Sequence, residues 1–479
     1  MENGIQTYQK AIDNIMIAPD IQPVCRCSTT AIEGFIMCDY PGCHRSPVGS
    51  TSKCFFHLPA ESELKPPPHE LNREAREDMK RGEYDFDGCI FNGKQDFSKL
   101  GFSVDTSFSL AHFLGDVDFS GSSFGKYTNF SQARFEGFVD LSNVTFMDNV
   151  SFANASFAEQ GSAKSKRYNA IVVKHANFQK KANFTGAEFG GGNAIFQATR
   201  FNGIEANFSN CKFHGRITFF RDCHFDGNCF FVGAQFSGAE ASFTKSEFRG
   251  DIVSFHAAQF TNDVTSFTQT QFMGGEVRFV LARFTGERAH FSRAEFSCQS
   301  VAFDGAAFVG GEVLFAETRF SCDITFCSIE IGSDISFDAV RLGEKSQFQF
   351  ESANFVRSRE NAPRLLFRRI RFNPLQTFFD NVRSGNQFLD SNVSERPILL
   401  FRQCQLKDVF FSNNEMMLFS FFSSVFFEES HLFSNQWIER PERLAGFIPF
   451  RSIRRTQIVE EEMLEQLKAV GGDIFKSCG

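Results

Sequence analysis

The sequence predicts an all-β solenoid, a fold in which short strands wind into stacked coils around one continuous core. Three observations support this prediction. Phenylalanine accounts for 66 of the 479 residues, against one tryptophan and five tyrosines, so one side-chain shape is used at one recurring site. It recurs at steps of five, six or seven residues along most of the chain. Small or β-branched residues precede it, and turn-forming residues follow it.

The spacing excludes both a helix and a single flat strand. The stretch FRGDIVSFHAAQFTNDVTSFTQTQF, residues 248–272, has alternate steps of seven and five, at Phe248, Phe255, Phe260, Phe267 and Phe272. On a helix these steps drift by about 120° every twelve residues, so no apolar stripe forms. In one straight strand, odd steps place successive rings on opposite faces. Each unit is therefore predicted to be one short extended side followed by a corner.

Each short side places two residues inside. Val253 precedes Phe255 by two residues, and similar small residues precede the other phenylalanines. The residue between them points outward. We therefore expect Phe267 in the core and Ser266 on an exposed outer face. The steps alternate five and six from residue 86 to 135, and mostly five and seven from 184 to 320.

Several units match a known repeat closely. ANFTG (182–186), VDFSG (117–121) and AEFSC (294–298) resemble the A-[DN]-L-x-x unit of pentapeptide-repeat proteins. The resemblance covers roughly residues 85–430 and implies a right-handed quadrilateral β-helix with four units per coil. Phenylalanine largely replaces leucine here, and every second unit carries extra residues. We therefore expect coils of about 22 to 24 residues, with corners enlarged on opposite sides.

The sequence divides into four predicted regions. They are an N-terminal segment with a metal module (1–60), a Pro-rich linker with a capping helix (61–84), the β-helix (85–435) and a C-terminal helical tail (436–479). An open coil is an exposed sheet edge and needs a cover, which the helical composition of residues 69–84 can supply. The stretch TQIVEEEMLEQLKAVGG (456–472) predicts an amphipathic helix, ended by Gly471 and Gly472, that caps the rod or mediates homo-oligomerisation.

Two segments break the repeat. Residues 158–177 contain Lys164, Lys166, Arg167 and Lys174, and residues 356–366 interrupt it again. Either they are tolerated surface insertions or they are loops that bind a partner.

One constellation has metal chemistry. Residues 38–57 have the spacing C-x4-C-x10-C-x2-H, with Cys38, Cys43, Cys54 and His57 as the four candidate ligands. Tetrahedral zinc takes four nitrogen or sulfur ligands, and such a site lets a short segment fold without a core. The stretch resembles the small zinc motifs of three cysteines and one histidine that accompany some pentapeptide-repeat proteins. Four protein ligands predict a closed, structural Zn²⁺ site, with incidental reduced cysteines as the alternative.

Nearby residues leave the ligand set open. Cys25 and Cys27 lie just upstream, and His44 adjoins Cys43, so an exchanged ligand or a second site is an alternative. Most other cysteines occupy repeat positions, where packed thiols are expected. Glycine-rich phosphate loops and nucleophile elbows are missing from the sequence, which predicts a protein that is not an enzyme.

The predicted function is a structural or protein-interaction scaffold with a protein partner and no direct nucleic-acid binding. The net charge of -8 disfavours a generic nucleic-acid binder. The start of the chain lacks a secretory signal, and no apolar run is long enough to span a membrane, which predicts a cytoplasmic location. One alternative, implied by the resemblance, is a DNA-mimicking inhibitor of a type II topoisomerase (gyrase). Another is a membrane-associated adaptor, suggested by the basic stretch of Arg357, Arg359, Arg364, Arg368, Arg369, Arg371 and Arg383.

Overall fold

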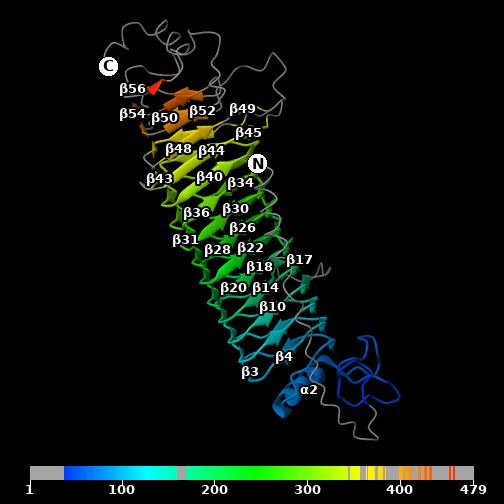
Figure 1. The fold of residues 1–479 in the computed structure, drawn as a ribbon. Helices are drawn as coiled ribbons and strands as arrows, with labels where there is room; N and C mark the ends of the chain where they lie inside the picture. Colours follow the sequence, from blue (N-terminus) through cyan, green and yellow to red (C-terminus); the bar gives the residue numbers. More distant parts are fainter. Residues whose placement is uncertain are drawn as a thin grey trace, which may run out of the picture. The chain divides into compact units, whose positions relative to one another are not determined.

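The structure, a computed structural model, describes residues 37–158, 169–343, 346–356, 363 and 365–372, and beyond these only the backbone of short strands up to Ile458. The chain divides into two compact parts between Phe55 and Phe56. In the second part, one helix is followed by an elongated stack of short strands (Figure 1).

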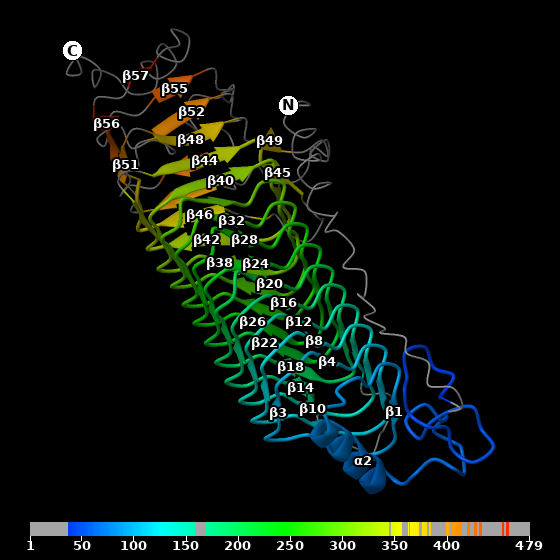
Figure 2. The same ribbon diagram turned by 60° about the horizontal axis from the view of Figure 1, so that its bottom comes forward.

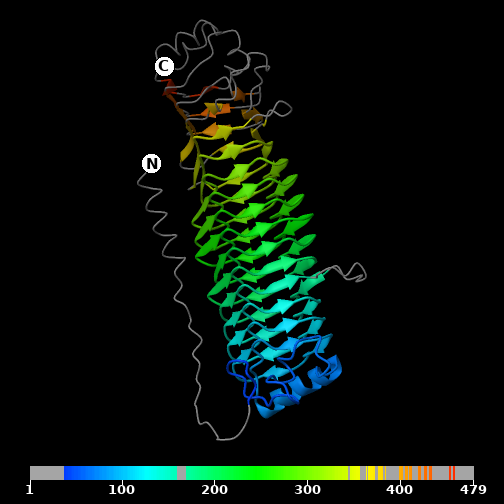
Figure 3. The ribbon, with the colours of Figure 1, turned by 90° about the vertical axis from the view of Figure 1, so that its right-hand side faces the viewer.

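Four short strands make each coil. The first coil consists of β1 (Ile90–Phe91), β2 (Gln95–Asp96), β3 (Gly101–Phe102) and β4 (Thr106–Ser107). The chain then returns to β5 (His112–Phe113), which pairs in parallel with β1. Every fourth strand joins the same sheet, which gives parallel sheets of 13, 14, 15 and 15 strands, named here sides 1 to 4 after β1 to β4. The predicted four-sided solenoid is confirmed (Figures 2 and 3).

Equivalent positions in successive coils give the coil length. Near the start of the solenoid, Ser109 and Ser131 occupy the same corner of neighbouring coils and lie 22 residues apart. Further along, His214 and Ser237 lie 23 residues apart. Arg293 and Glu317 occupy the same corner at a separation of 24 residues. These lengths agree with the coil length expected from the phenylalanine spacing.

The extra residues lie on opposite sides of the coil. The strands β28 (Ile252–Ser254) on side 4 and β30 (Val264–Ser266) on side 2 have three residues. The intervening β29 (Gln259–Phe260) and β31 (Gln271–Phe272) have two. The corners that lead into sides 2 and 4 are therefore wide, and the corners that leave them are tight.

Stacked phenylalanine rings fill the interior. Phe267 is fully buried, and its ring lies 4.8 Å from Phe243 and 5.0 Å from Phe291, with interplanar angles of 2° and 6°. It also meets Phe255 and Phe279 edge to face, at 5.3 and 5.4 Å. Parallel offset and edge-to-face contacts are the two arrangements that the ring quadrupole favours. Each ring therefore packs within its own coil and against both neighbouring coils.

Ser266 does not lie on an exposed face as expected. Only 8% of its surface is accessible. Its hydroxyl lies 3.1 Å from the Thr244 hydroxyl of the preceding coil and donates to the Thr268 hydroxyl at 3.0 Å. The alternation of inward and outward residues holds, but small outward side chains are covered by the coils above and below.

The tight corners are four-residue turns with a left-handed residue. At Phe108–Ala111 the Ala111 N–H donates to the Phe108 carbonyl at 3.1 Å, and Leu110 has φ 57°. Nineteen residues other than glycine have positive φ in the described chain, although this region disfavours side chains. The Leu110 N–H donates to Ser131 of the next coil at 3.0 Å, so ladder hydrogen bonds help to hold the turn.

The helix α2 (Pro68–Arg81) covers the first edge of the solenoid. Asn72 Nδ2 and an Arg76 guanidinium nitrogen both donate to the Asp96 carbonyl of β2, at 3.1 and 2.7 Å. The chain just before the helix also takes part, because the Phe56 carbonyl accepts from the Ile90 N–H of β1 at 2.8 Å. These bonds satisfy backbone groups that an open edge would leave to solvent, as expected for a capping helix.

The first interruption is shorter than the sequence indicated. Strand β13 (Ser156–Ala158) ends on side 1, and β14 (Asn169–Val172) is already paired with β10 (Val139–Asp140) on side 2. Lys174 therefore lies back within the coil, whereas Lys164, Lys166 and Arg167 lie outside the described residues. The second interruption, between β45 (Asn354–Phe355) and β46 (Leu365–Arg368), lies mostly outside them too.

The ladder also continues beyond residue 435. Strands β56 (Ile453–Arg454) and β57 (Gln457–Ile458) pair with sides 3 and 4. The first residues of the predicted C-terminal helix are thus in a strand, and the rest of that helix lies outside the described residues.

Candidate metal centre

The four predicted ligands lie together. One ligand atom each from Cys38, Cys43, Cys54 and His57 lies within 4.8 Å of all the others. Cys38, Cys54 and His57 are at most 6% exposed, and Cys43 is partly exposed. A single short segment thus brings three sulfurs and one imidazole to one point, although the structure assigns no helix or strand to residues 38–57.

Local turns explain how so short a segment does this. The Cys43 N–H donates to the Tyr40 carbonyl at 3.0 Å, and Gly42 has φ 82°. This is a turn with Pro41 second and a left-handed glycine third, a sequence that such turns favour. The Cys38 N–H donates to the Arg45 carbonyl at 3.0 Å, and the Cys54 N–H points to the Cys38 sulfur at 3.3 Å. An N–H donor to sulfur stabilises a thiolate ligand.

The imidazole of His57 is oriented from the solenoid. Its Nε2 lies 2.8 Å from the Asp87 carbonyl oxygen, which can only accept, so Nε2 carries the proton and Nδ1 is the nitrogen with a lone pair suited to a metal ion. The backbone on both sides of His57 is held by the buried Lys65, whose Nζ donates to the carbonyls of Phe56 and Leu58 at 3.0 and 2.9 Å. A backbone carbonyl on the second ring nitrogen is the usual partner of a metal-bound histidine.

The distances fit tetrahedral zinc. Two thiolates on one zinc ion lie about 3.8 Å apart, because the Zn–S bond is about 2.3 Å and the angle is tetrahedral. The sulfurs of Cys43 and Cys54 are 3.8 Å apart. Three sulfurs and one nitrogen also match the ligand preference of zinc. The residues present therefore fit a closed zinc site with His57 bound through Nδ1, in which the ion would hold the segment folded.

The sequence missed two neighbours of the site. The Cys89 sulfur lies 3.8 Å from His57 Nε2, and Asp87 supplies the carbonyl described above. Burial raises the pKa of the Asp87 carboxyl, against hydrogen bonds from Ser107 and Ser109. Neither neighbour could be predicted, because they follow His57 by 30 and 32 residues and approach it only once the first coil is capped.

The open alternatives for the ligand set are partly resolved. His44 is exposed and is not among the four clustered residues. Cys25 and Cys27 lie outside the described residues.

Three cysteines inside the solenoid are packed thiols. Cys211, Cys223 and Cys229 are fully buried. Burial raises the pKa of Cys223 to about 12 and raises the pKa values of Cys211 and Cys229 as well. At neutral pH these thiols are protonated, so they are poor nucleophiles.

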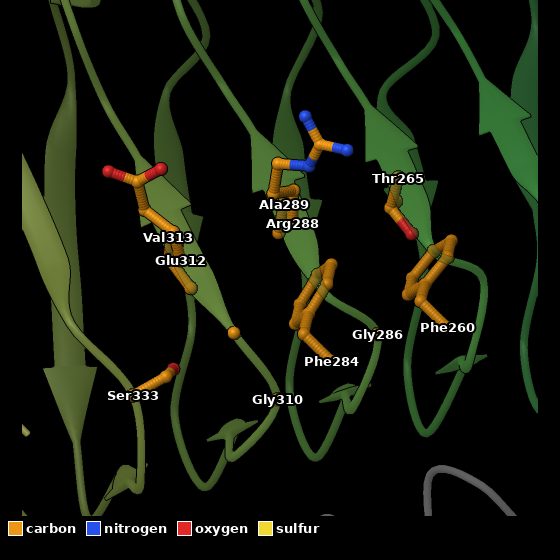
Figure 4. A pocket seen from close by; sticks show the side chains of 11 residues that line it. Phe260, Thr265, Phe284, Gly286, Arg288, Ala289, Gly310, Glu312, Val313 and Ser333 are labelled. Atoms are coloured by element: carbon orange, nitrogen blue, oxygen red, sulfur yellow. The ribbon is translucent and has the colours of Figure 1, made fainter. Parts of the chain in front are cut away.

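A narrow recess lies at the wide corners between sides 1 and 2. Figure 4 shows it beside Phe260, Phe284, Gly286, Gly310 and Ser333. It is too narrow to hold a water molecule. A substrate pocket is typically several hundred cubic ångströms, so this recess is not one.

In the part of the chain that the structure describes, no helix is both long and apolar enough to cross a bilayer.

Comparisons with known proteins give little beyond this geometry. No family model and no curated protein matches the chain. Among solved structures, the chain is similar to HetL, a pentapeptide repeat protein involved in heterocyst differentiation regulation from the cyanobacterium Nostoc sp.. The identity is 13% over 59% of this chain and 95% of that chain, with a TM-score of 0.21. The four-sided fold of this chain therefore rests on its own sheets and register and not on that likeness.

Proposed function

We propose that the chain is a non-enzymatic scaffold, a stiff four-sided rod that binds other proteins, whose N-terminal module is held by one structural zinc ion. The observation that carries this proposal is the filled interior. Phenylalanine rings stack from coil to coil on all four sides, and the recess of Figure 4 cannot hold even water. Such a rod offers its outer sides, not an internal pocket, for recognition.

Ion pairs between neighbouring coils lie on the outer sides of the middle coils. Arg293 forms an ion pair with Glu317 of the next coil at 3.0 Å, and Arg319 lies 3.4 Å from Glu295. Similar pairs join Arg221 to Glu240 and Lys181 to Glu205. Exposed pairs contribute little to stability, but they neutralise the carboxylates that a DNA-like acidic surface would need. Over residues 181–319 these pairs weigh against a continuous acidic, DNA-like surface and so against the topoisomerase-inhibitor alternative.

The zinc part of the proposal is tested by metal content. Purified full-length protein should contain about one zinc ion per chain, measured by inductively coupled plasma mass spectrometry. Cys43→Ser should lose the ion, whereas Cys327→Ser, a half-buried thiol of the solenoid, should keep it. Zinc retained by Cys43→Ser, or zinc absent from wild-type protein purified without chelators, would overturn the proposed site.

The scaffold part is tested by partner capture with cross-linking. Full-length protein in cell lysate is treated with an amine-reactive cross-linker, and cross-linked peptides are identified by mass spectrometry. Exposed lysines lie on different parts of the rod, among them Lys99, Lys212 and Lys245. Repeated links from these positions to the same protein, absent for an unrelated control protein, are expected. A clean absence of such links at physiological salt would argue against a scaffold.

A further inference from the structure

Two cysteines of neighbouring coils lie in contact, far along the chain from the metal module. Cys298 follows β35 (Glu295–Phe296) by two residues, and Cys322 follows β39 (Arg319–Phe320) by two. These strands pair in register, with Phe296 opposite Phe320. The two cysteines therefore occupy the same wide corner in successive coils, and their sulfurs are 3.3 Å apart.

The geometry favours a sulfur–sulfur bond over a shared metal ion. Two thiolates on a tetrahedral zinc lie about 3.8 Å apart, and the observed 3.3 Å is shorter than that. Successive coils are separated by about 4.8 Å, which falls within the Cα–Cα range of about 4.4 to 6.8 Å that disulfides span. The stacking therefore places the two cysteines within the range of separations at which a disulfide can form.

We propose that Cys298 and Cys322 are a thiol pair that a peroxide oxidises to a reversible disulfide. The Cys298 thiol loses its proton, its thiolate attacks one oxygen of hydrogen peroxide, and the O–O bond breaks. The sulfur becomes a sulfenic acid, and the leaving hydroxide takes up the proton that the thiol lost, which gives one water. The Cys322 sulfur then attacks the sulfenic sulfur, its proton leaves with the hydroxyl group as a second water, and the S–S bond forms. One peroxide is reduced by two electrons as two thiols are oxidised, and thiol exchange reverses the reaction.

The environment assigns the two roles. A hydrogen bond from Cys322 lowers the pKa of Cys298, while the pKa of Cys322 is raised by the same contact and by burial. Cys298 is 9% exposed and Cys322 is 4% exposed, so Cys298 is the more accessible residue of the two. It is the one that a peroxide reaches first, and Cys322 resolves the product.

The bond would join two different kinds of coil. Strand β36 (Ser300–Ala302), which follows Cys298, has three residues, whereas β40 (Asp323–Cys327), which follows Cys322, has five. Oxidation would thus tie the last regular coils to the first widened ones. Separation of the two coils at that junction would then require reduction of the disulfide.

Hydrogen peroxide treatment of the full-length, metal-loaded protein tests the proposal. After blocking of remaining thiols, trypsin should yield peptides 294–319 and 320–341 linked together and lighter by two hydrogen atoms. The second peptide also contains Cys327, so Cys327→Ser is the matched control and should keep the link. Cys298→Ser and Cys322→Ser should each lose it, and a reductant should release it from wild type.

Several results would overturn the proposal. They are a link that survives Cys322→Ser, a link lost in Cys327→Ser, or peptides that stay unlinked while other cysteines of the same sample are oxidised. Unchanged far-ultraviolet circular dichroism shows that a variant is folded. Should either serine variant fail to fold, the wild-type cross-linked peptide, fragmented to locate the bonded sulfurs, decides the question alone.

Discussion

Replacement of one core ring should cost several kilocalories per mole and act locally. Phe267→Ala removes a fully buried ring that stacks on Phe243 and Phe291 and meets Phe255 and Phe279 at their edges. The rigid stacks above and below cannot collapse into the gap, so the cost falls within the range for buried phenylalanine, about 3 to 5 kcal/mol. Because each coil contacts only its neighbours, the loss is concentrated in nearby coils.

Hydrogen exchange followed by mass spectrometry measures this loss where it occurs. Peptides covering residues 243–291 should exchange faster in Phe267→Ala, while peptides from residues 90–150 should keep their wild-type rates. The matched control is Gln259→Ala, an exposed outward position on side 1, which should change stability by less than about 0.5 kcal/mol. A loss below about 1 kcal/mol for Phe267→Ala, or equal effects of the two variants, would refute the reasoning from the stacked core.

Four further outcomes are expected. Zinc chelation should unfold the module around Cys54 but leave the solenoid folded, as limited proteolysis with peptide mapping would show. Ala257→Gly should stabilise by about 0.5 to 1 kcal/mol in chemical denaturation, because φ at this corner is 52° and glycine tolerates it. Gly286→Ala should destabilise strongly, since an added Cβ would lie 1.6 Å from a backbone oxygen, whereas Gly190→Ala has open space and should be neutral in the same titration. Burial and a nearby arginine lower the pKa of His256 in the folded protein. The stabilising contribution of the neutral imidazole is therefore present above about pH 6.5 and is lost as the pH falls. His256→Gln should flatten that part of a profile of melting temperature against pH.

The sequence carried the coil plan because each phenylalanine marks one side of a coil. Its spacing therefore predicted the coil length and the wide corners on opposite sides. The ligands of the metal centre were also predictable, because Cys38 to His57 form one short segment in which spacing limits geometry. The end of the first interruption was not predictable from the sequence, because the strand ladder resumes at Asn169 with residues that do not match the repeat.

What the sequence could not show depends on contacts between coils. Ser266 is covered by side chains of adjacent coils, and Cys89 meets His57 only through the capped first coil. The left-handed corners were also hidden, because residues such as Leu110 and Ala257 hold positions where glycine or asparagine is the usual signal. Neighbouring hydrogen bonds override the local preference there.

The change in coil length affects which strands pair with one another during folding. A strand of a uniform solenoid could pair one coil too early or too late and still bury its phenylalanine. Here, the short coils that end at Phe157 are followed by longer coils between Phe189 and Phe308. A segment displaced by one coil across that change would leave one or two residues unmatched at a wide corner. The uneven spacing therefore favours a single pairing register as successive coils add to the solenoid.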